Sequence, residues 1–275
     1  MPDEMREEDK LPGVAPEVAG PPAGLGESLP PPAPSPWGSR DLGLFVALFV
    51  FAAIVFPVLA VAVYAALRPF MGWRLRAEDL TTNPFFLVSI QSVSYVLVVG
   101  YIYTLVVLSY RLPFWAGLKW RRPTARQVLQ YALGGMLLGV LIAHAPPLLP
   151  DREDFPLERL FSSPGAAYAL AVFAVAVAPF VEELIFRGVL FAFFERLVGL
   201  RFAIVGTAVL FAALHVPEYW GAWNHAFLIL VVAVVLSLAR GITGSLTPSV
   251  ILHLTFNASM IVAQALAPQH ACGVH

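Results

Sequence analysis

Three ionisable side chains lie within six residues of an otherwise apolar stretch, APFVEELIFRG at residues 178–188, and they are Glu182, Glu183 and Arg187. Each would cost roughly 2.5 to 3.5 kcal/mol at the centre of a bilayer, unless it faces the protein interior and pairs. Glu183 and Arg187 stand four residues apart, on one face of a helix, which favours an ion pair. Glu182 points about 100° away from them on a helix. We therefore expect Glu182 to be the carboxylate that acts, with the ion pair in support.

Two later segments add polar groups to apolar runs. Phe211 is followed by His215 one helical turn later, and His253 is followed by Asn257 at the same spacing, which puts each pair on one helix face. Each group alone also has an ordinary structural explanation. The charges could be solvated at a helix end, and the His and Asn side chains could join helices by hydrogen bonds. A carboxylate, two histidines and an asparagine on three apolar helices could instead converge on one site.

The three segments together resemble a known signature. In chain order they read Glu182-Glu183-x-x-x-Arg187, Phe211-x-x-x-His215 and His253-x-x-x-Asn257. This order is similar to the three motifs of the CPBP family of CAAX proteases and bacteriocin-processing enzymes, also called the Abi family. The resemblance covers roughly residues 160–267, including the glycine at 188 and the connection 241–248. It implies an intramembrane endopeptidase similar to the type II CAAX prenyl endopeptidase, which removes the last three residues of prenylated proteins.

The resemblance also implies a role for each polar group. Glu182 would be the general base that activates water, with help from His215. His253 and Asn257 would donate hydrogen bonds to the developing oxyanion, where a low dielectric makes such donors strong. The Glu183–Arg187 pair would hold the helix face in place. General chemistry agrees with the first role, because a desolvated carboxylate holds a proton more tightly and so is a stronger base.

Participation of a metal is left open by the sequence. Two histidines and a glutamate can form a zinc site whose bound water is acidified, and the family is often labelled a metalloprotease on this basis. The local His-Glu-x-x-His pattern is absent from this chain. A glutamate and a histidine that share one water without a metal fit the same residues equally well. A divalent metal such as zinc therefore stays one of two alternatives.

The composition indicates what kind of protein holds these groups. Of 275 residues, 59% are hydrophobic and 13% are charged, with a mean hydropathy of +0.76. Soluble domains carry about 25% charged residues, so a soluble monomer is excluded. The net charge of −1 offers no basic field for nucleic acid. With Cys272 as the single cysteine, the chain has no intramolecular disulfide and no cysteine-rich metal site.

Seven long apolar runs follow the first 40 residues, and a helix needs about 20 such residues to cross a bilayer. They span residues 42–67, 80–110, 127–150, 160–181, 202–217, 219–239 and 241–267. Residues 188–197 either extend the fourth run or form an eighth, short helix. We therefore expect an all-α, polytopic transmembrane bundle of seven or eight helices.

Two regions follow from this pattern. Residues 1–40 hold 10 of the 24 prolines and are expected to be a disordered tail. Residues 41–270 form the expected protease domain. Basic residues favour cytoplasmic loops, which places the tail and the loop between the second and third runs inside the cell. The basic residues of that side are Arg111, Lys119, Arg121, Arg122 and Arg126, joined by Arg196, Arg201 and Arg240 if seven helices are counted.

Three functions fit these features. The first is a membrane-embedded peptide-bond hydrolase whose substrate is a peptide or a membrane-anchored protein. The second is a transporter or channel, since buried Glu and His chains also mark ion paths. Transporters usually show inverted repeats, and no such symmetry is visible here. The third is a catalytically silent scaffold of the same fold, which the intact motifs disfavour.

Overall fold

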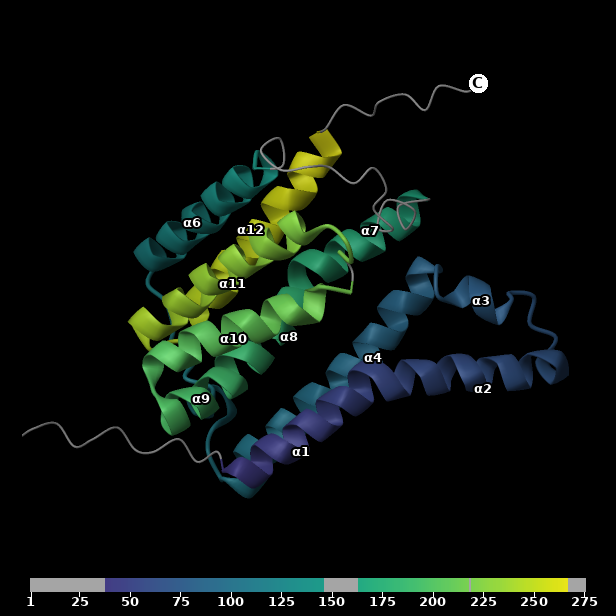
Figure 1. The fold of residues 1–275 in the computed structure, drawn as a ribbon, viewed down its shortest axis with the longest axis horizontal. Coiled ribbons are helices and arrows are strands. Elements are labelled where there is room, and N and C mark those ends of the chain that lie inside the picture. The colour runs from purple at the N-terminus through teal and green to yellow at the C-terminus, as the bar shows by residue number, and fades with distance from the viewer. Residues whose placement is uncertain (1–37, 146–162, 218, 267–275) are drawn as a thin grey trace, which may run out of the picture. The chain divides into compact units, whose positions relative to one another are not determined.

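The computed structural model describes residues 38–145, 163–217 and 219–266, and within these ranges all regular secondary structure is helical (Figure 1). The expected all-α fold is confirmed. The Pro-rich tail lies almost entirely outside the described residues. The chain divides into two units, residues 1–34 and 35–275, and everything below concerns the second.

The helices are numbered in chain order, and four of their segments are π-helical turns labelled η. The first half contains α1 (Ser39–Val50), η1 (Phe51–Val55), α2 (Phe56–Met71), α3 (Ala77–Leu80), α4 (Pro84–Tyr103), η2 (Thr104–Ser109), α5 (Phe114–Gly117) and α6 (Ala125–Ala143). The second half contains α7 (Pro164–Val172), η5 (Phe173–Val177), α8 (Ala178–Glu183), η6 (Leu184–Leu190), α9 (Phe191–Val198), α10 (Leu200–His215), α11 (Trp223–Thr243) and α12 (Thr247–Leu266).

Six helices of the described chain are long and apolar enough to cross a membrane. They are Ser39–Met71, Pro84–Ser109, Ala125–Ala143, Pro164–Val198, Trp223–Thr243 and Thr247–Leu266. The run at 202–217 forms only the shorter helix α10, whose 16 residues reach about 24 Å, less than the hydrocarbon core. Residues 188–197 extend the fourth run without a break, because Pro164–Val198 is one continuous helical stretch. The chain is an integral, multi-pass membrane protein.

Local sequence signals set several helix ends. The side chain of Asn83 accepts a hydrogen bond from the backbone N–H of Phe86 at 3.1 Å and caps α4. Thr124 and Gln127 form a reciprocal capping box at the start of α6. Gly244 ends α11 with φ of 61°, a left-handed conformation that glycine adopts without steric cost. These ends fix where α4, α6 and α11 enter the bundle.

Helices α6 and α12 lie in close contact because glycines of α6 face α12. Gly135 and Gly139 stand four residues apart and are both buried. A methyl group at Gly135 would collide with the backbone carbonyl of Leu252, and one at Gly139 would collide with the hydroxyl of Ser259. Small residues at such spacing let two helix backbones approach closely in a membrane. This contact holds α12, and with it two of the predicted site residues.

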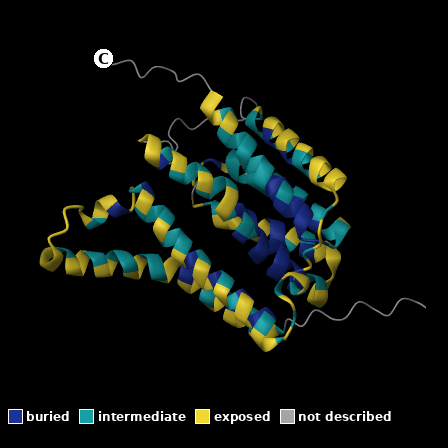
Figure 2. Ribbon diagram, turned by 180° about the vertical axis from the view of Figure 1, so that it is seen from behind, coloured by how far each residue is buried: buried dark blue, intermediate teal, exposed yellow. Residues whose placement is uncertain are grey.

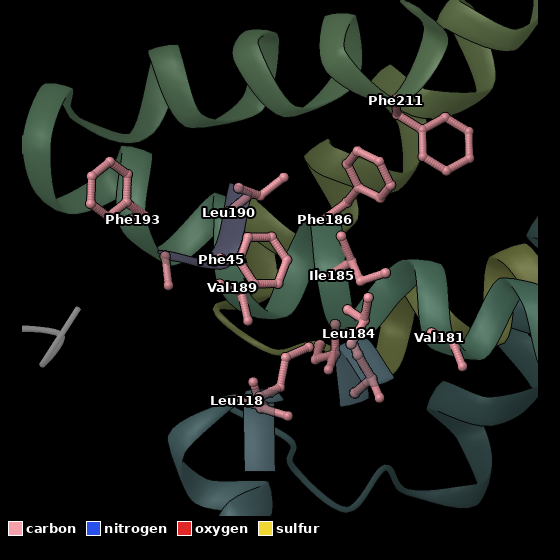
Figure 3. Close-up of a cluster of buried hydrophobic side chains, with 14 of the residues drawn as sticks. Phe45, Leu118, Val181, Leu184, Ile185, Phe186, Val189, Leu190, Phe193 and Phe211 are labelled. Carbon is pink, nitrogen blue, oxygen red and sulfur yellow. The ribbon is translucent and has the colours of Figure 1, made fainter. Parts of the chain in front are cut away.

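The most buried part of the described chain is the turn that follows the acidic pair. Every residue of η6, from Leu184 to Leu190, is buried, whereas α2 has no buried residue (Figure 2). Figure 3 shows Phe186 and Phe211 side by side in this core, and their rings meet edge to face at 5.0 Å. Leu184, Ile185, Val189 and Leu190 of η6 belong to the same hydrophobic cluster (Figure 3). The core of the protein therefore surrounds the helix that carries the predicted site.

Candidate active site

The ion pair expected from the spacing of Glu183 and Arg187 is present. Nη1 of Arg187 donates to Oε1 of Glu183 at 2.8 Å, and both side chains are fully buried. Arg187 also donates from Nη2 to the backbone carbonyl of Ala233 at 2.9 Å. Its guanidinium carbon lies 4.8 Å from the centre of the Phe211 ring, within the range of a cation–π contact. The charge is thus held by protein groups on α8, α10 and α11.

His253 connects α12 to the same carboxylate. Its Nδ1 lies 2.9 Å from Oε1 of Glu183. A carboxylate oxygen can only accept, so Nδ1 carries a proton in this contact. The other ring nitrogen, Nε2, lies 3.9 Å from Oε2 of Glu182, which is beyond hydrogen-bond distance. Glu183 therefore fixes the ring of His253 so that its second nitrogen faces Glu182.

Glu182 has different surroundings from its neighbour in sequence. Its side chain is 19% exposed, and its Oε1 accepts a hydrogen bond from the hydroxyl of Tyr95 on α4 at 3.1 Å. Consecutive residues on a helix point in directions about 100° apart, so the two acids contact different elements. Glu182 lines a cavity, whereas Glu183 and Arg187 do not.

His215 also lines this cavity, at the end of α10. Its Nδ1 lies 2.8 Å from the backbone carbonyl of Phe211, so that nitrogen carries a proton. The imidazole stacks on the Phe211 ring with the centroids 4.6 Å apart. In the neutral ring, Nε2 is then the nitrogen that can accept a proton.

Asn257 is the fourth predicted group in the cavity wall. Its Nδ2 donates to the backbone carbonyl of Ala174 in η5 at 2.8 Å, which ties α12 to the helix that carries Glu182. An amide nitrogen has two N–H groups, so a second donor is available.

The cavity has a volume of about 860 Å³ and is lined by segments from both halves of the described chain. Of the six predicted site residues, four lie in its wall: Glu182, His215, His253 and Asn257. Apolar side chains of α1, α4, α11 and α12 form much of the rest, including Phe49, Val98, Ile229 and Met260. The arrangement joins one partly exposed carboxylate, two imidazoles and an amide to an apolar chamber.

Comparison with protein families identifies the segment that contains this arrangement. Residues 164–259 match the family described as type II CAAX prenyl endopeptidase Rce1-like. The matched segment is called the Rce1-like domain below. The resemblance carried by the three motifs is thereby confirmed. Neither the curated proteins nor the solved structures contain a match to this chain.

Participation of a divalent metal stays a prediction. Among the described residues, no group of three or more His, Cys, Asp or Glu side chains is placed to hold a metal ion. Nδ1 of His253 is already engaged by Glu183, and Nδ1 of His215 by a backbone carbonyl. The ring nitrogens that remain are Nε2 of each histidine, and that of His253 lies 3.9 Å from Oε2 of Glu182.

Three groups beside the Rce1-like motifs were not predicted as parts of the site. Tyr95 lies outside residues 164–259, but the polar residues Gln91, Ser94 and Tyr95 in an apolar run were a signal that one face of this helix meets protein. Tyr219 and His225 also line the cavity, with their rings stacked at 5.8 Å.

Arg240 was expected on the cytoplasmic side if seven helices cross the membrane, and the structure buries its side chain within the protein. It is 1% exposed and lies on α11. Its Nε donates to the backbone carbonyl of Arg187 at 3.0 Å, and its guanidinium lies 4.8 Å from the centre of the Phe191 ring. The π-helical turn of the Rce1-like domain is therefore held by an arginine more than 50 residues away in sequence.

Proposed function

We propose that this protein is an intramembrane endopeptidase that hydrolyses a peptide bond of a membrane-associated or lipidated protein or peptide, with Glu182 as the base. The observation that carries the proposal is the division between the two adjacent acids. Glu183 is fully buried against Arg187 and His253, while Glu182 faces the cavity. Membership of residues 164–259 in a family of CAAX-type proteases supports the same reaction class.

The first chemical step is the activation of water. Oε1 of Glu182 is hydrogen-bonded to Tyr95, so Oε2 is the oxygen that takes the proton. Nε2 of a neutral His215 can accept a hydrogen bond from the same water and align it. The hydroxide oxygen then forms a bond to the carbonyl carbon of the substrate, whose π electrons move to the carbonyl oxygen. Glu182 next gives its proton to the leaving nitrogen as the C–N bond breaks.

The developing oxyanion needs donors in the cavity wall. The second N–H of Asn257 is one, and Nε2–H of His253 is another when its ring is doubly protonated. The carboxylate of Glu183 accepts from Nδ1 and so holds the ring in this orientation. Donors that are fixed before the reaction in a site with little water act more strongly than donors in solution. Arg187 keeps Glu183 charged and in place for this role.

The shape and lining of the cavity support a substrate with an apolar part. The cavity is lined by the polar groups and by apolar side chains of the surrounding helices. Those helices also expose many large apolar side chains on the outside of the protein. A peptide bond next to a lipid chain or a membrane segment could therefore enter from the bilayer side. No step of this mechanism runs through a metal ion.

The test is cleavage by the purified full-length chain in lipid vesicles. The probes are fluorogenic peptides, some with a farnesylated cysteine followed by three residues and some without lipid. Wild type is compared with Glu182→Gln, and each is repeated with a chelator and with added zinc. Glu78→Gln is the matched control, since Glu78 is exposed on α3 and far in sequence from the motifs.

We expect wild type and Glu78→Gln to cut at the same rate and Glu182→Gln to lose at least about 1,000-fold in kcat. Equal cutting by Glu182→Gln would contradict the proposed base. Cutting that stops with chelator and returns with zinc would contradict the metal-free mechanism. A wild-type protein that cuts none of the peptides would favour the transporter or scaffold functions instead.

A further inference from the structure

Tyr95 reaches the proposed base from a helix outside the Rce1-like domain. Its hydroxyl donates to Oε1 of Glu182 at 3.1 Å, across 87 residues of sequence. Its ring lies parallel to that of Phe173 in η5, with the centroids 5.8 Å apart and an angle of 7° between the planes. The family match begins at residue 164 and so assigns no role to this tyrosine.

The hydrogen bond distinguishes the two oxygens of the carboxylate. Oε1 is engaged by Tyr95, and Oε2 lies on the side of His253, 3.9 Å from Nε2. The last torsion of a glutamate is broad and roughly two-fold, so an unrestrained carboxylate would exchange its oxygens and sample many orientations. A donor fixed on one oxygen restricts that rotation and leaves the other oxygen aimed at the substrate.

Tyr95 is itself fixed by its helix. The neighbouring Ser94 is buried and donates from its hydroxyl to the backbone carbonyl of Ala52 in η1 at 2.7 Å. Helix α4 also packs against α7, which precedes the helical turn that carries Glu182. The tyrosine hydroxyl is therefore held from two directions, through α4 and through its ring stack on η5.

We propose that Tyr95 is a positioning residue that orients the carboxylate of Glu182 for catalysis. This inference rests on the proposed function, because it requires Glu182 to be the base. On this proposal, helix α4 in the N-terminal half contributes a residue to the active site. The Rce1-like domain then supplies the reacting groups, and α4 supplies the contact that aligns one of them.

The decisive variant is Tyr95→Phe, which keeps the ring and its stack on Phe173 and removes only the hydroxyl. Tyr101→Phe is the matched control, since Tyr101 lies on the same helix and its hydroxyl donates instead to the backbone carbonyl of Asp41 at 3.3 Å. Both are made in the full-length chain, purified into lipid vesicles and tested on the peptide that wild type cuts fastest.

We expect Tyr95→Phe to lower kcat about 10- to 100-fold, the range for loss of a hydrogen bond to a charged group, and to leave KM within about twofold. Tyr101→Phe should keep the wild-type kcat. Thermal unfolding of both variants is measured alongside, and equal midpoints show that the loss is not one of folding. An unchanged kcat for Tyr95→Phe, or a change in KM alone, overturns the inference.

A double mutant separates this inference from the proposed function. Glu182→Asp keeps the carboxylate and shortens its reach toward Tyr95, so adding Tyr95→Phe to it should lower the residual kcat less than about twofold. A further tenfold loss in that background would mean that Tyr95 acts independently of Glu182, and the inference would fail while the base remained. Full activity of Glu182→Gln would instead remove the proposed function itself.

Discussion

Two helical stretches of nearly equal length differ sharply in what surrounds them. Ser39–Met71 has 33 residues and Pro164–Val198 has 35, and both are apolar enough to cross a membrane. In the most apolar window of the first, 11% of the residues are buried inside the protein, against 33% in the second (Figure 2). The second stretch therefore meets protein over a larger share of its residues than the first.

The contrast shows where a membrane protein can carry charge. Leu59 and Phe70 on α2 are exposed, in a place where an ionised group would face hydrocarbon. On the second stretch, Glu183 and Arg187 are fully buried and bonded to groups of η6, α11 and α12. Hydropathy alone marks both stretches as membrane helices. The fully buried ion pair of Glu183 and Arg187 distinguishes the stretch that can hold a site.

Among the proposed variants, Arg187→Met should lower the free energy of unfolding the most. The substitution leaves Glu183 buried without its guanidinium partner, and breaking a buried ion pair costs about 3–5 kcal/mol. The free energy of unfolding, measured by denaturant titration in mixed micelles, should fall by that amount. Activity should fall with it, because His253 loses the fixed carboxylate that orients its ring.

The matched control for that variant is Arg76→Met. Arg76 pairs with Glu78 while both side chains are more than half exposed, and exposed ion pairs contribute about 0–1 kcal/mol. The unfolding free energy of this variant should stay within about 1 kcal/mol of wild type. Equal losses for Arg76→Met and Arg187→Met would refute the difference between the two pairs.

The next prediction compares the loss of stability caused by a Leu→Ala substitution in each of the two stretches. Leu184 is 1% exposed in η6 and Leu59 is 49% exposed in α2. Leu184→Ala should destabilise the protein by about 2–5 kcal/mol because it leaves a cavity in the core. Leu59→Ala should change stability by no more than about 0.5 kcal/mol. Thermal and denaturant unfolding of the pair check this, and a Leu59→Ala loss as large as that of Leu184→Ala would show that α2 is covered by protein.

A smaller effect is expected where two helix backbones touch. Gly135→Ala forces α6 away from the Leu252 carbonyl on α12, and overpacking of this kind costs about 1–3 kcal/mol. A shift of α12 would also displace Asn257, so peptide cleavage should slow. Gly100→Ala on α4 is the control, since a methyl group there meets nothing within 4 Å and alanine favours the helix. A stable, fully active Gly135→Ala would contradict the close approach.

Much of the fold could be predicted because membrane helices need long apolar runs. The observed helices begin and end within a few residues of the runs over much of the chain, as for 42–67 and Ser39–Met71. The sequence did not decide whether residues 188–197 form a separate helix. The structure continues the helix through them, because Glu183 and Arg187 are satisfied by protein groups and give no reason for it to end.

The site was predictable only within each helix. The spacing of Glu183 and Arg187 indicates their ion pair, since i,i+4 neighbours share a helix face. Contacts between helices depend on how the helices pack, and the spacing of residues along the sequence does not predict that packing. Three contacts between helices could therefore not be predicted: the hydrogen bond of Tyr95 to Glu182, the burial of Arg240 and the glycine contact of α6 with α12. The catalytic roles of the cavity residues stay predictions until the cleavage experiment is done.

The π-helical turns carry a consequence for how this sequence can be compared with its relatives. A π turn closes its hydrogen bond one residue farther along than an α turn, so it holds one residue more. Among the described residues, such turns lie within Ser39–Met71, Pro84–Ser109 and Pro164–Val198, while α6, α10, α11 and α12 have none. Because the wider turn absorbs that extra residue, its loss from a π turn would leave a regular α-helix whose later residues keep nearly the same direction. Single-residue alignment gaps among relatives should therefore gather at the four described π turns, η1, η2, η5 and η6.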